Sequence, residues 1–183
     1  VFTGFITATP IKTKGIAPGV LKTRIKQLET LTGTKVRRVR HDGDKEYVIK
    51  DLKAWNDDKG ITSEKTAPYK SQQNGKVKRV NRTVMERVPP ALLDAGAAKE
   101  QWAEGFASVV HVLNQSAKAG LDVTPQEART GRRPNVAGFR VWRSRAWALK
   151  PKKQQRKLEA RTDVGRFVGY TVGGGAYRIL EDE

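Results

Sequence analysis

Apolar residues recur at helical spacing in the first part of the chain. Between positions 18 and 33 they follow at intervals of three or four, with basic residues between them: Leu21, Ile25, Leu28 and Leu31. Such spacing places the apolar side chains on one face, so the pattern predicts an amphipathic helix over Pro18 to Gly33. Gly33 itself is a suitable residue to end that helix.

Three later stretches also have helical patterns. Residues 51–59 predict a short helix that turns Leu52 and Trp55 inward and ends at Gly60. Residues 76–88 predict a longer helix, which the pair Pro89-Pro90 should end or kink because proline cannot donate a hydrogen bond within a helix. Residues 100–114 predict a third.

The apolar stripes of the last two helices define the faces that we expect to be buried. In residues 76–88 the stripe consists of valines, namely Val77, Val80, Val84 and Val88. In residues 100–114 it consists mostly of larger side chains, namely Trp102, Phe106, Val109 and Leu113. Both stripes predict packing against a core.

Stretches rich in β-branched and aromatic residues predict three strands between the helices. They cover residues 2–11, 35–41 and 61–66, and residues 68–75 have the composition of a loop. The order strand, helix, strand, helix, strand, loop, helix indicates an α/β core. Asp42 then lies just beyond a strand end, where open sheets expose their chemistry.

The pattern changes after this core. Thr124 precedes Pro125 and Glu127, an arrangement that predicts a helix start with Thr124 as its N-cap. Short strand-like runs follow at 167–170 and 177–180, on either side of three consecutive glycines. They indicate a separate, β-rich part near the end of the chain.

Charge is the next strong feature. The chain has 36 Lys and Arg against 19 Asp and Glu, a net charge of +17 and a pI near 10.3. Residues 129–166 alone contain 13 Lys and Arg but only two acids. This charge favours a polyanionic partner, nucleic acid first, although ribosomal and membrane-surface proteins share it.

Composition also excludes several classes of protein. No apolar run reaches the roughly 18 residues of a membrane-spanning helix. The chain has no cysteine, which excludes disulfides and thiolate metal sites and fits a reducing compartment. Its 183 residues suit one domain with an appendage, or two small domains.

Two segments carry the candidate chemistry. Asp42 lies in RHDGDKEY at residues 40–47, Lys78 lies in QQNGKVKRVNRT at residues 72–83, and 35 residues separate them. Taken alone, the Asp-Gly-Asp and Asn-Gly pairs are turn chemistry. Taken together, the segments resemble SDNGGEY and QQNGVAERxNRT, two signatures of the copia-type retrotransposon integrase core, at the same spacing.

Further matches to that family follow in the same order along almost the whole chain. Residues 6–14 are similar to its strand TWVYPLKSK, and residues 101–106 to its helix FWAEAV. Shorter similarities lie at 60–61 with 66–69 (GI…TxPY), at 124–127 with 131–134 (TPxExWxGxKP) and at 167–170 (FLGY).

The resemblance implies the ribonuclease-H-like fold of the retroviral-integrase superfamily, an α/β fold with a mixed sheet flanked by helices. It implies an incomplete catalytic core at 1–115, a linker with a short helix at 116–138, and a basic β-rich extension at 139–183. The first strands of the sheet, with the family's first catalytic Asp, and a His/Cys zinc module are expected upstream of Val1. Exposed sheet edges would then disfavour folding of this segment alone.

In the family, Asp42 corresponds to the second catalytic Asp and Lys78 to the catalytic Glu. Integrases are polynucleotidyl transferases that use Mg²⁺ or Mn²⁺ held by several carboxylates. Asp42 can supply one oxygen ligand, whereas the charged ammonium of Lys78 cannot bind the ion and repels it. We therefore expect a vestigial metal site at Asp42, no productively bound metal and no catalysis; Glu46 is expected to be structural rather than an extra ligand.

Basic residues of one helix and of the C-terminal extension are expected to contact nucleic acid. On the helix these are Lys76, Lys78 and Arg82, and on the extension they are Arg143, Arg145, Lys150, Lys152, Lys153, Arg156 and Lys157. The run at 150–157 fits a nuclear-import patch as well as a phosphate-binding loop.

The histidines and two tryptophans have plainer expectations. His41 and His111 have no spacing that suggests a shared metal, so they are expected to be structural or incidental. Trp142 and Trp147 are expected in the core rather than stacked on bases.

Two functions remain open from the sequence. The first is the integrase segment of a retrotransposon polyprotein, inactive in this copy but able to bind DNA or RNA. The alternative is a domesticated, non-catalytic nucleic-acid-binding module. Either is expected in the nucleus or cytoplasm, away from membranes, and related integrases suggest a homo-oligomer.

Overall fold

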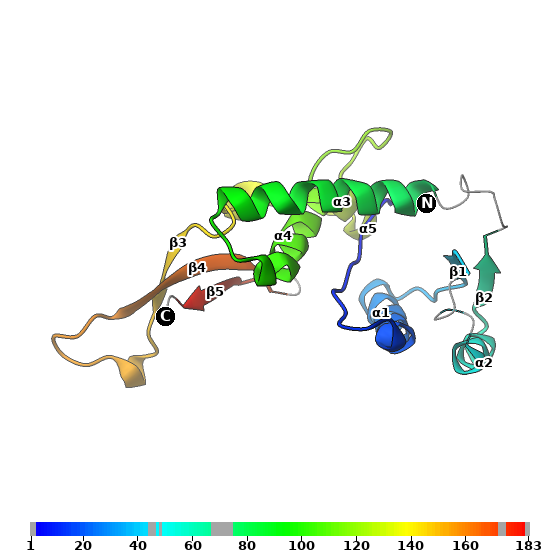
Figure 1. Ribbon diagram of the computed structural model, residues 1–183, viewed down its shortest axis with the longest axis horizontal. Coiled ribbons are helices and arrows are strands. Elements are labelled where there is room, and N and C mark those ends of the chain that lie inside the picture. Colours follow the sequence, from blue (N-terminus) through cyan, green and yellow to red (C-terminus); the bar gives the residue numbers. More distant parts are fainter. Residues whose placement is uncertain (1–2, 44–46, 48, 67–74, 172–174, 182–183) are drawn as a thin grey trace. The chain divides into compact units, whose positions relative to one another are not determined.

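The computed structural model describes residues 3–43, 47, 49–66, 75–171 and 175–181 (Figure 1). Its helices are α1 (Ala17–Thr32), α2 (Lys50–Asp58), α3 (Gly75–Asp94), α4 (Trp102–Gln115) and α5 (Pro125–Thr130). Its strands are β1 (Arg38–His41), β2 (Thr62–Lys65), β3 (Arg145–Leu149), β4 (Thr162–Tyr170) and β5 (Tyr177–Glu181). These elements form two compact units: Thr9–Arg82 is one, and the remaining described residues form the other.

Helix α1 confirms the first prediction almost to the residue. Pro18 lies in its first turn, and Gly33 caps its end in the left-handed conformation, with φ of 64° and an N–H that donates to the Glu29 carbonyl. Of the predicted stripe, Ile25 is only 3% exposed whereas Leu31 is 66% exposed, so the helix buries its middle and not its last turn.

Strands β1 and β2 pair in parallel, with Arg38 opposite Thr62 and His41 opposite Lys65 (Figure 1). Both were predicted, although each is shorter than its pattern suggested. Helix α2 packs against β2, where Leu52 and Ile61 are among the most buried apolar side chains. The predicted loop at 68–75 lies almost wholly outside the described residues.

Helix α3 does not end at the proline pair; it continues to Asp94. Pro89 and Pro90 are both exposed, while Val84 and Val88 are buried and Ala91 and Leu92 are half-buried. Packing on both sides of the prolines supports the helix across them, so tertiary contacts outweigh the local penalty. The predicted end of the helix at this pair was therefore wrong, whereas the alternative, a kink there, stays a prediction.

In the second unit, α4 packs against α5 and β4. Its buried positions are Gly105, Ser108, Val110 and Asn114, so the buried face is rotated from the predicted one. Trp102 is 42% exposed instead of buried. The Trp142 ring packs beside Gly105, 3.5 Å from where a Cβ would stand, which is an ordinary van der Waals distance.

Strands β3, β4 and β5 form an antiparallel sheet with β4 in the centre (Figure 1). Phe167 and Val168 of β4 belong to the core, and the pairing with β5 is irregular between Phe167 and Gly169. The two predicted strand runs are confirmed within β4 and β5. Trp142 supports the sheet by donating its indole N–H to the Val168 carbonyl at 3.2 Å, whereas Trp147 is 60% exposed, against the prediction of a core residue.

The predicted strand over residues 2–11 is absent from its described part, 3–11. Instead, the backbone of Ile6 bonds to one side chain of α4. The Ile6 N–H donates to Asn114 Oδ1 at 2.8 Å, and Asn114 Nδ2 donates to the Ile6 carbonyl at 2.8 Å. The Asn114 amide thus makes the hydrogen bonds to Ile6 that a paired strand would otherwise make.

Candidate functional site

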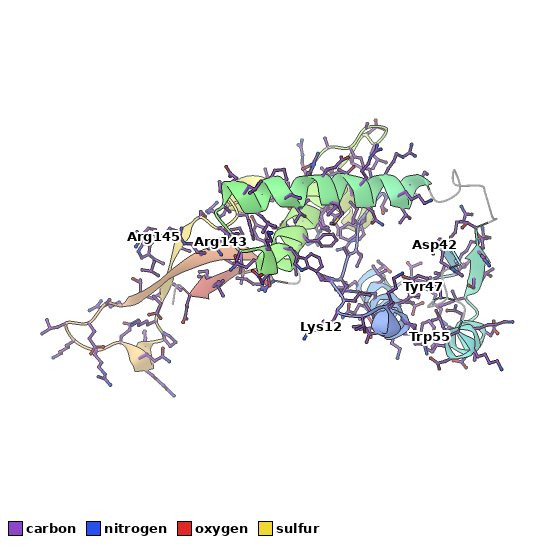
Figure 2. All side chains as sticks on the ribbon, viewed as in Figure 1. Lys12, Asp42, Tyr47, Trp55, Arg143 and Arg145 are labelled. Atoms are coloured by element: carbon purple, nitrogen blue, oxygen red, sulfur yellow. The ribbon has the colours of Figure 1, made fainter. Side chains whose placement is uncertain are left out.

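Asp42 lies exposed directly after β1, as predicted, at a turn organised by His41 (Figure 2). The Gly43 N–H donates to His41 Nδ1 at 3.1 Å, which leaves Nε2 as the protonated nitrogen of the neutral ring. Nε2 lies 3.0 Å from Ser63 Oγ on β2 and can donate to it. His41 therefore joins the turn to the neighbouring strand, a structural role.

The groups around this turn are mainly cationic. The Lys65 side chain covers Gly43, with Cδ 2.9 Å from an ideal Cβ position there. The nearby acid Glu64 is engaged by two arginines of β1, at 2.9 Å from Arg38 Nε and 2.9 Å from Arg40 Nη2. Asp42 thus has a basic neighbourhood along both strands.

This donor set does not fit a pair of divalent cations. Asp42 offers a carboxylate, but Glu64 is held by guanidiniums and position 78 is a lysine. Within the described residues no three His, Asp or Glu side chains gather as metal ligands. Asp44 and Glu46 lie outside the described residues, and the assignment of Asp42 as a vestigial metal ligand stays a prediction.

Lys78 is exposed in the first turn of α3, and Lys76 and Arg82 are exposed on the same helix. Four residues separate Lys78 from Arg82, so the two lie one helical turn apart on one face. The helix thus presents the basic side chains that the sequence predicted. Their contact with nucleic acid stays a prediction.

Two arginines before and within β3 differ in their surroundings (Figure 2). Arg143 has a positive φ of 63°, and its Nη1 donates to Gln101 Oε1 in the turn before α4. The Arg143 guanidinium therefore has a partner within the protein, Gln101. Arg145 is exposed, with its guanidinium 5.4 Å from the centre of the Trp147 ring.

The segment between β3 and β4, residues 150–161, presents the other predicted contacts. Lys152, Lys153 and Lys157 are exposed. Lys150 pairs with Asp163 at 3.1 Å, and Arg156 lies 3.6 Å from Glu159. Lys150 and Asp163 are half-buried, whereas the Arg156–Glu159 pair is exposed and should be weak, since surface ion pairs contribute only about 0–1 kcal/mol.

A feature that the sequence reasoning missed is a cleft of about 510 Å³ beside α4 and α5. Aromatic rings from distant parts of the chain meet there. His111 of α4 stacks on Tyr170 of β4 with ring centres 4.0 Å apart, and Phe139 and Tyr177 lie against the same ring. Sequence reasoning missed this cluster because His111, Phe139 and Tyr170 are 28 and 31 residues apart in turn, and no local pattern joins such positions.

Burial lowers the pKa of His111 and favours its neutral form. The Gln115 amide nitrogen lies 2.5 Å from His111 Nε2, so the neutral ring accepts a hydrogen bond there. His111 is therefore a packed structural residue of the cleft, in line with the expectation for it.

Several known proteins are similar to this chain. A retroviral polymerase SH3-like domain model matches residues 144–183, the antiparallel sheet. A Pol polyprotein from transposon TNT 1-94 of Nicotiana tabacum is 31% identical over 155 residues, which cover 84% of this chain. The Pol polyproteins from transposons RE2 and RE1 of Arabidopsis thaliana are 23% and 25% identical over 98% of it.

Two solved structures share the fold. One is a chain of the simian T-cell lymphotropic virus intasome in complex with PP2A regulatory subunit B56 gamma, with a TM-score of 0.59 and 15% identity over 98% of this chain and 66% of that one. The other is the catalytic core domain of BIV integrase, with a TM-score of 0.50 and 19% identity over 70% of this chain and 80% of that one. The chain spans 12% of the length of each transposon polyprotein named above.

Proposed function

Because the chain is integrase-core-like and homologous to the Pol polyproteins of plant transposons, we propose that it is a copia-type integrase segment that binds nucleic acid without catalysing strand transfer. The observation that carries this proposal is Lys78. It is an exposed cation on α3 at the position where the family signature has its catalytic Glu.

The binding half of the proposal rests on charge and its placement. The net charge of +17 is spread over both units, with exposed cations on α3 and on residues 150–161. Lysine and arginine neutralise phosphates and release counterions, which gives affinity without sequence preference. DNA is the first candidate partner, and RNA shares the same backbone chemistry.

The catalytic half rests on what two-metal transfer requires. Metal ions stabilise the attacking and leaving oxygens only where carboxylates hold them in place. Replacing one carboxylate by an ammonium changes the local charge by two units. Each 1.36 kcal/mol of lost stabilisation costs about tenfold in rate, so a site altered in this way should be nearly silent.

A salt titration tests binding. The affinity for a labelled DNA duplex should fall linearly on a log–log plot against salt concentration, with a slope of about −0.9 per neutralised phosphate. Related duplexes of different sequence should give nearly the same affinity. A slope near zero would sink the proposal.

A strand-transfer assay tests the chemistry. We expect no Mg²⁺- or Mn²⁺-dependent joining of an oligonucleotide ending in CA-3′ to plasmid DNA. Joining by the unmodified chain that disappears with Asp42→Ala would show that another acid has replaced the carboxylate lost at Lys78.

The domesticated, non-catalytic module shares both expectations, so these assays do not separate it from a polyprotein segment. The two possibilities differ in what is encoded beside this segment. A reverse transcriptase encoded in the same reading frame indicates a polyprotein segment, and fusion to unrelated domains indicates reuse. We also propose the nucleus or cytoplasm as the location and self-association as in related integrases; among the described helices, none has the length and apolarity to cross a membrane.

A further inference from the structure

The cleft beside α4 and α5, here called the ring cleft, lies wholly within the second unit. Its walls come from α4, α5, the segment 132–139, and the facing ends of β4 and β5. Its volume of about 510 Å³ falls within the roughly 300–1,000 Å³ typical of small-molecule sites. None of the predicted nucleic-acid contacts lines it.

The rings of the cleft are held in place. The Tyr170 hydroxyl accepts a hydrogen bond from the Arg140 N–H at 3.0 Å. The Tyr177 hydroxyl donates to the Gly138 carbonyl at 3.0 Å. With both phenols anchored and His111 stacked on Tyr170, the aromatic wall is formed before any ligand arrives.

The charge of the lining has one sign. Arg129, Arg132 and Arg133 contribute guanidiniums, and none of the described lining residues is Asp or Glu. Arg129 already lies over the Phe5 ring at 3.9 Å, while Arg132 and Arg133 are exposed. Guanidiniums pair with phosphate in a planar, bidentate manner.

From this combination we propose that the ring cleft binds an unpaired nucleotide of a single-stranded nucleic acid, with its base against the aromatic wall and its phosphate at Arg132 and Arg133. The inference rests on the nucleic-acid binding proposed above and assigns it a second site with its own substrate class. Every base has a π-face, so such stacking tolerates any sequence.

Bases within a duplex are not expected to bind in the ring cleft. Within a duplex, neighbouring base pairs cover the faces of each base, and a cleft of this size accepts a single extruded residue rather than a double helix. The ring cleft should therefore favour single strands, frayed ends or gaps, whereas the exposed lysines of residues 150–161 bind any phosphate backbone.

The test compares two exposed pairs of basic residues in the full chain. Arg132→Ala/Arg133→Ala changes the ring cleft, and Lys152→Ala/Lys153→Ala removes the same charge from outside it. Fluorescence anisotropy measures the affinity for labelled oligothymidine, for a duplex, and for an abasic strand of equal length. The informative quantity is the ratio of single-strand to duplex affinity.

We expect the arginine variant to lower this ratio, and the lysine variant to weaken both affinities while leaving the ratio unchanged. Phe139→Leu keeps an apolar side chain but removes a ring, so it should weaken oligothymidine binding by roughly tenfold and leave abasic binding unchanged. Thermal melting of each variant checks that the fold persists.

Three outcomes would overturn the inference. The first is an equal fall of the ratio in the arginine and lysine variants. The second is an abasic strand that binds as tightly as oligothymidine, and the third is a peptide rich in Glu and Tyr that competes better than oligothymidine. The last would assign the cleft to a protein partner. If the duplex also fails to bind in a salt-dependent manner, the proposed function itself is wrong; if the duplex binds, only this inference is.

Discussion

At the residue scale, Asn114 shows how one side chain can join two segments that lie far apart in the sequence. Its amide both accepts from and donates to the backbone of Ile6, 108 positions away, and it is only 6% exposed. A side-chain amide can do both, whereas a carboxylate accepts without donating.

Asn114→Asp should therefore lower the free energy of unfolding by about 1–3 kcal/mol, the cost of a buried polar group that loses its partner. The new carboxylate would face the Ile6 carbonyl, and both groups are acceptors. Urea unfolding measures the change. The exposed Asn81→Asp makes the same chemical replacement on α3 and should cost much less; equal losses would contradict this account.

His111 should make stability depend on pH. Because burial lowers its pKa below the ordinary value of 6.5, the unfolded chain binds a proton before the folded protein does. Above pH 6.5 the titration of His111 therefore leaves the stability of the folded protein unchanged. As the pH falls below 6.5, it reduces that stability.

Melting temperatures between about pH 7.5 and 5.5 test the effect, with the sign fixed by proton linkage. His111→Phe retains a ring beside Tyr170 but cannot titrate. We expect its melting temperature to fall less over this range than that of the unmodified protein. Parallel losses in the two proteins would assign the dependence to other groups.

Residues whose role is local were predictable from sequence. Thr124 accepts a hydrogen bond from the Glu127 N–H at 3.2 Å, as its position before Pro125 predicted. Trp102 and Trp147 were not predictable, because burial depends on which elements meet and not on the residue type alone. The basic character of positions 78 and 82 was visible in the sequence, but the Gln101 partner of Arg143 was not.

At the element scale, the central strand β4 requires a small residue at Gly165. A Cβ there would lie 2.8 Å from Ile179 Cγ2 and 3.0 Å from the Leu180 carbonyl carbon of β5. The second of these atoms belongs to the backbone and cannot rotate away. The glycine therefore permits β5 to pair closely with β4.

Gly165→Ala should destabilise the protein by about 1–3 kcal/mol, as overpacking usually does. Gly19→Ala in α1 is the matched control, since nothing lies within 4 Å of its Cβ position. A helix favours Ala over Gly, so this control should leave stability unchanged or raise it by up to about 1 kcal/mol. Denaturant unfolding of both variants distinguishes local crowding from a general effect of the added methyl group.

Helices were predicted better than strands because their periodic patterns are long. The segment at 2–11 has a strand-like composition, yet Asn114 supplies the hydrogen bonds to Ile6 that a neighbouring strand would otherwise make. Strand β3 was missed because Arg145–Leu149 mixes basic and aromatic residues with alanine. Pairing with β4 defines it, and pairing partners cannot be read from five residues.

At the scale of the whole molecule, two exposed sets of basic residues outside the ring cleft lie on α3 and in residues 150–161. Lys78→Ala/Arg82→Ala and Lys152→Ala/Lys153→Ala each remove two positive charges. If both sets contact phosphates, each variant should reduce the salt slope by up to about 1.8, from 0.9 per contact. Salt titrations of the two variants with one duplex measure this.

An unchanged slope in one variant would place the duplex on the other set alone. Loss of all binding on changing only Lys78 and Arg82 would locate the duplex on the face of α3. These results also test how far the sequence alone predicts a binding surface. Net charge predicts the class of partner, whereas the ring cleft depends on folding that joins residues 5, 111, 139, 170 and 177.

The proline pair in α3 should also affect how readily the helix opens locally. Pro89 and Pro90 carry no amide hydrogen to donate to the carbonyls of Met85 and Glu86, although the helix continues through them. Fewer bonds must break for this part of the helix to open. In deuterated solvent the amide hydrogens beside the prolines should thus exchange before those around the buried Val84. One continuous helix would then show two different rates of hydrogen exchange.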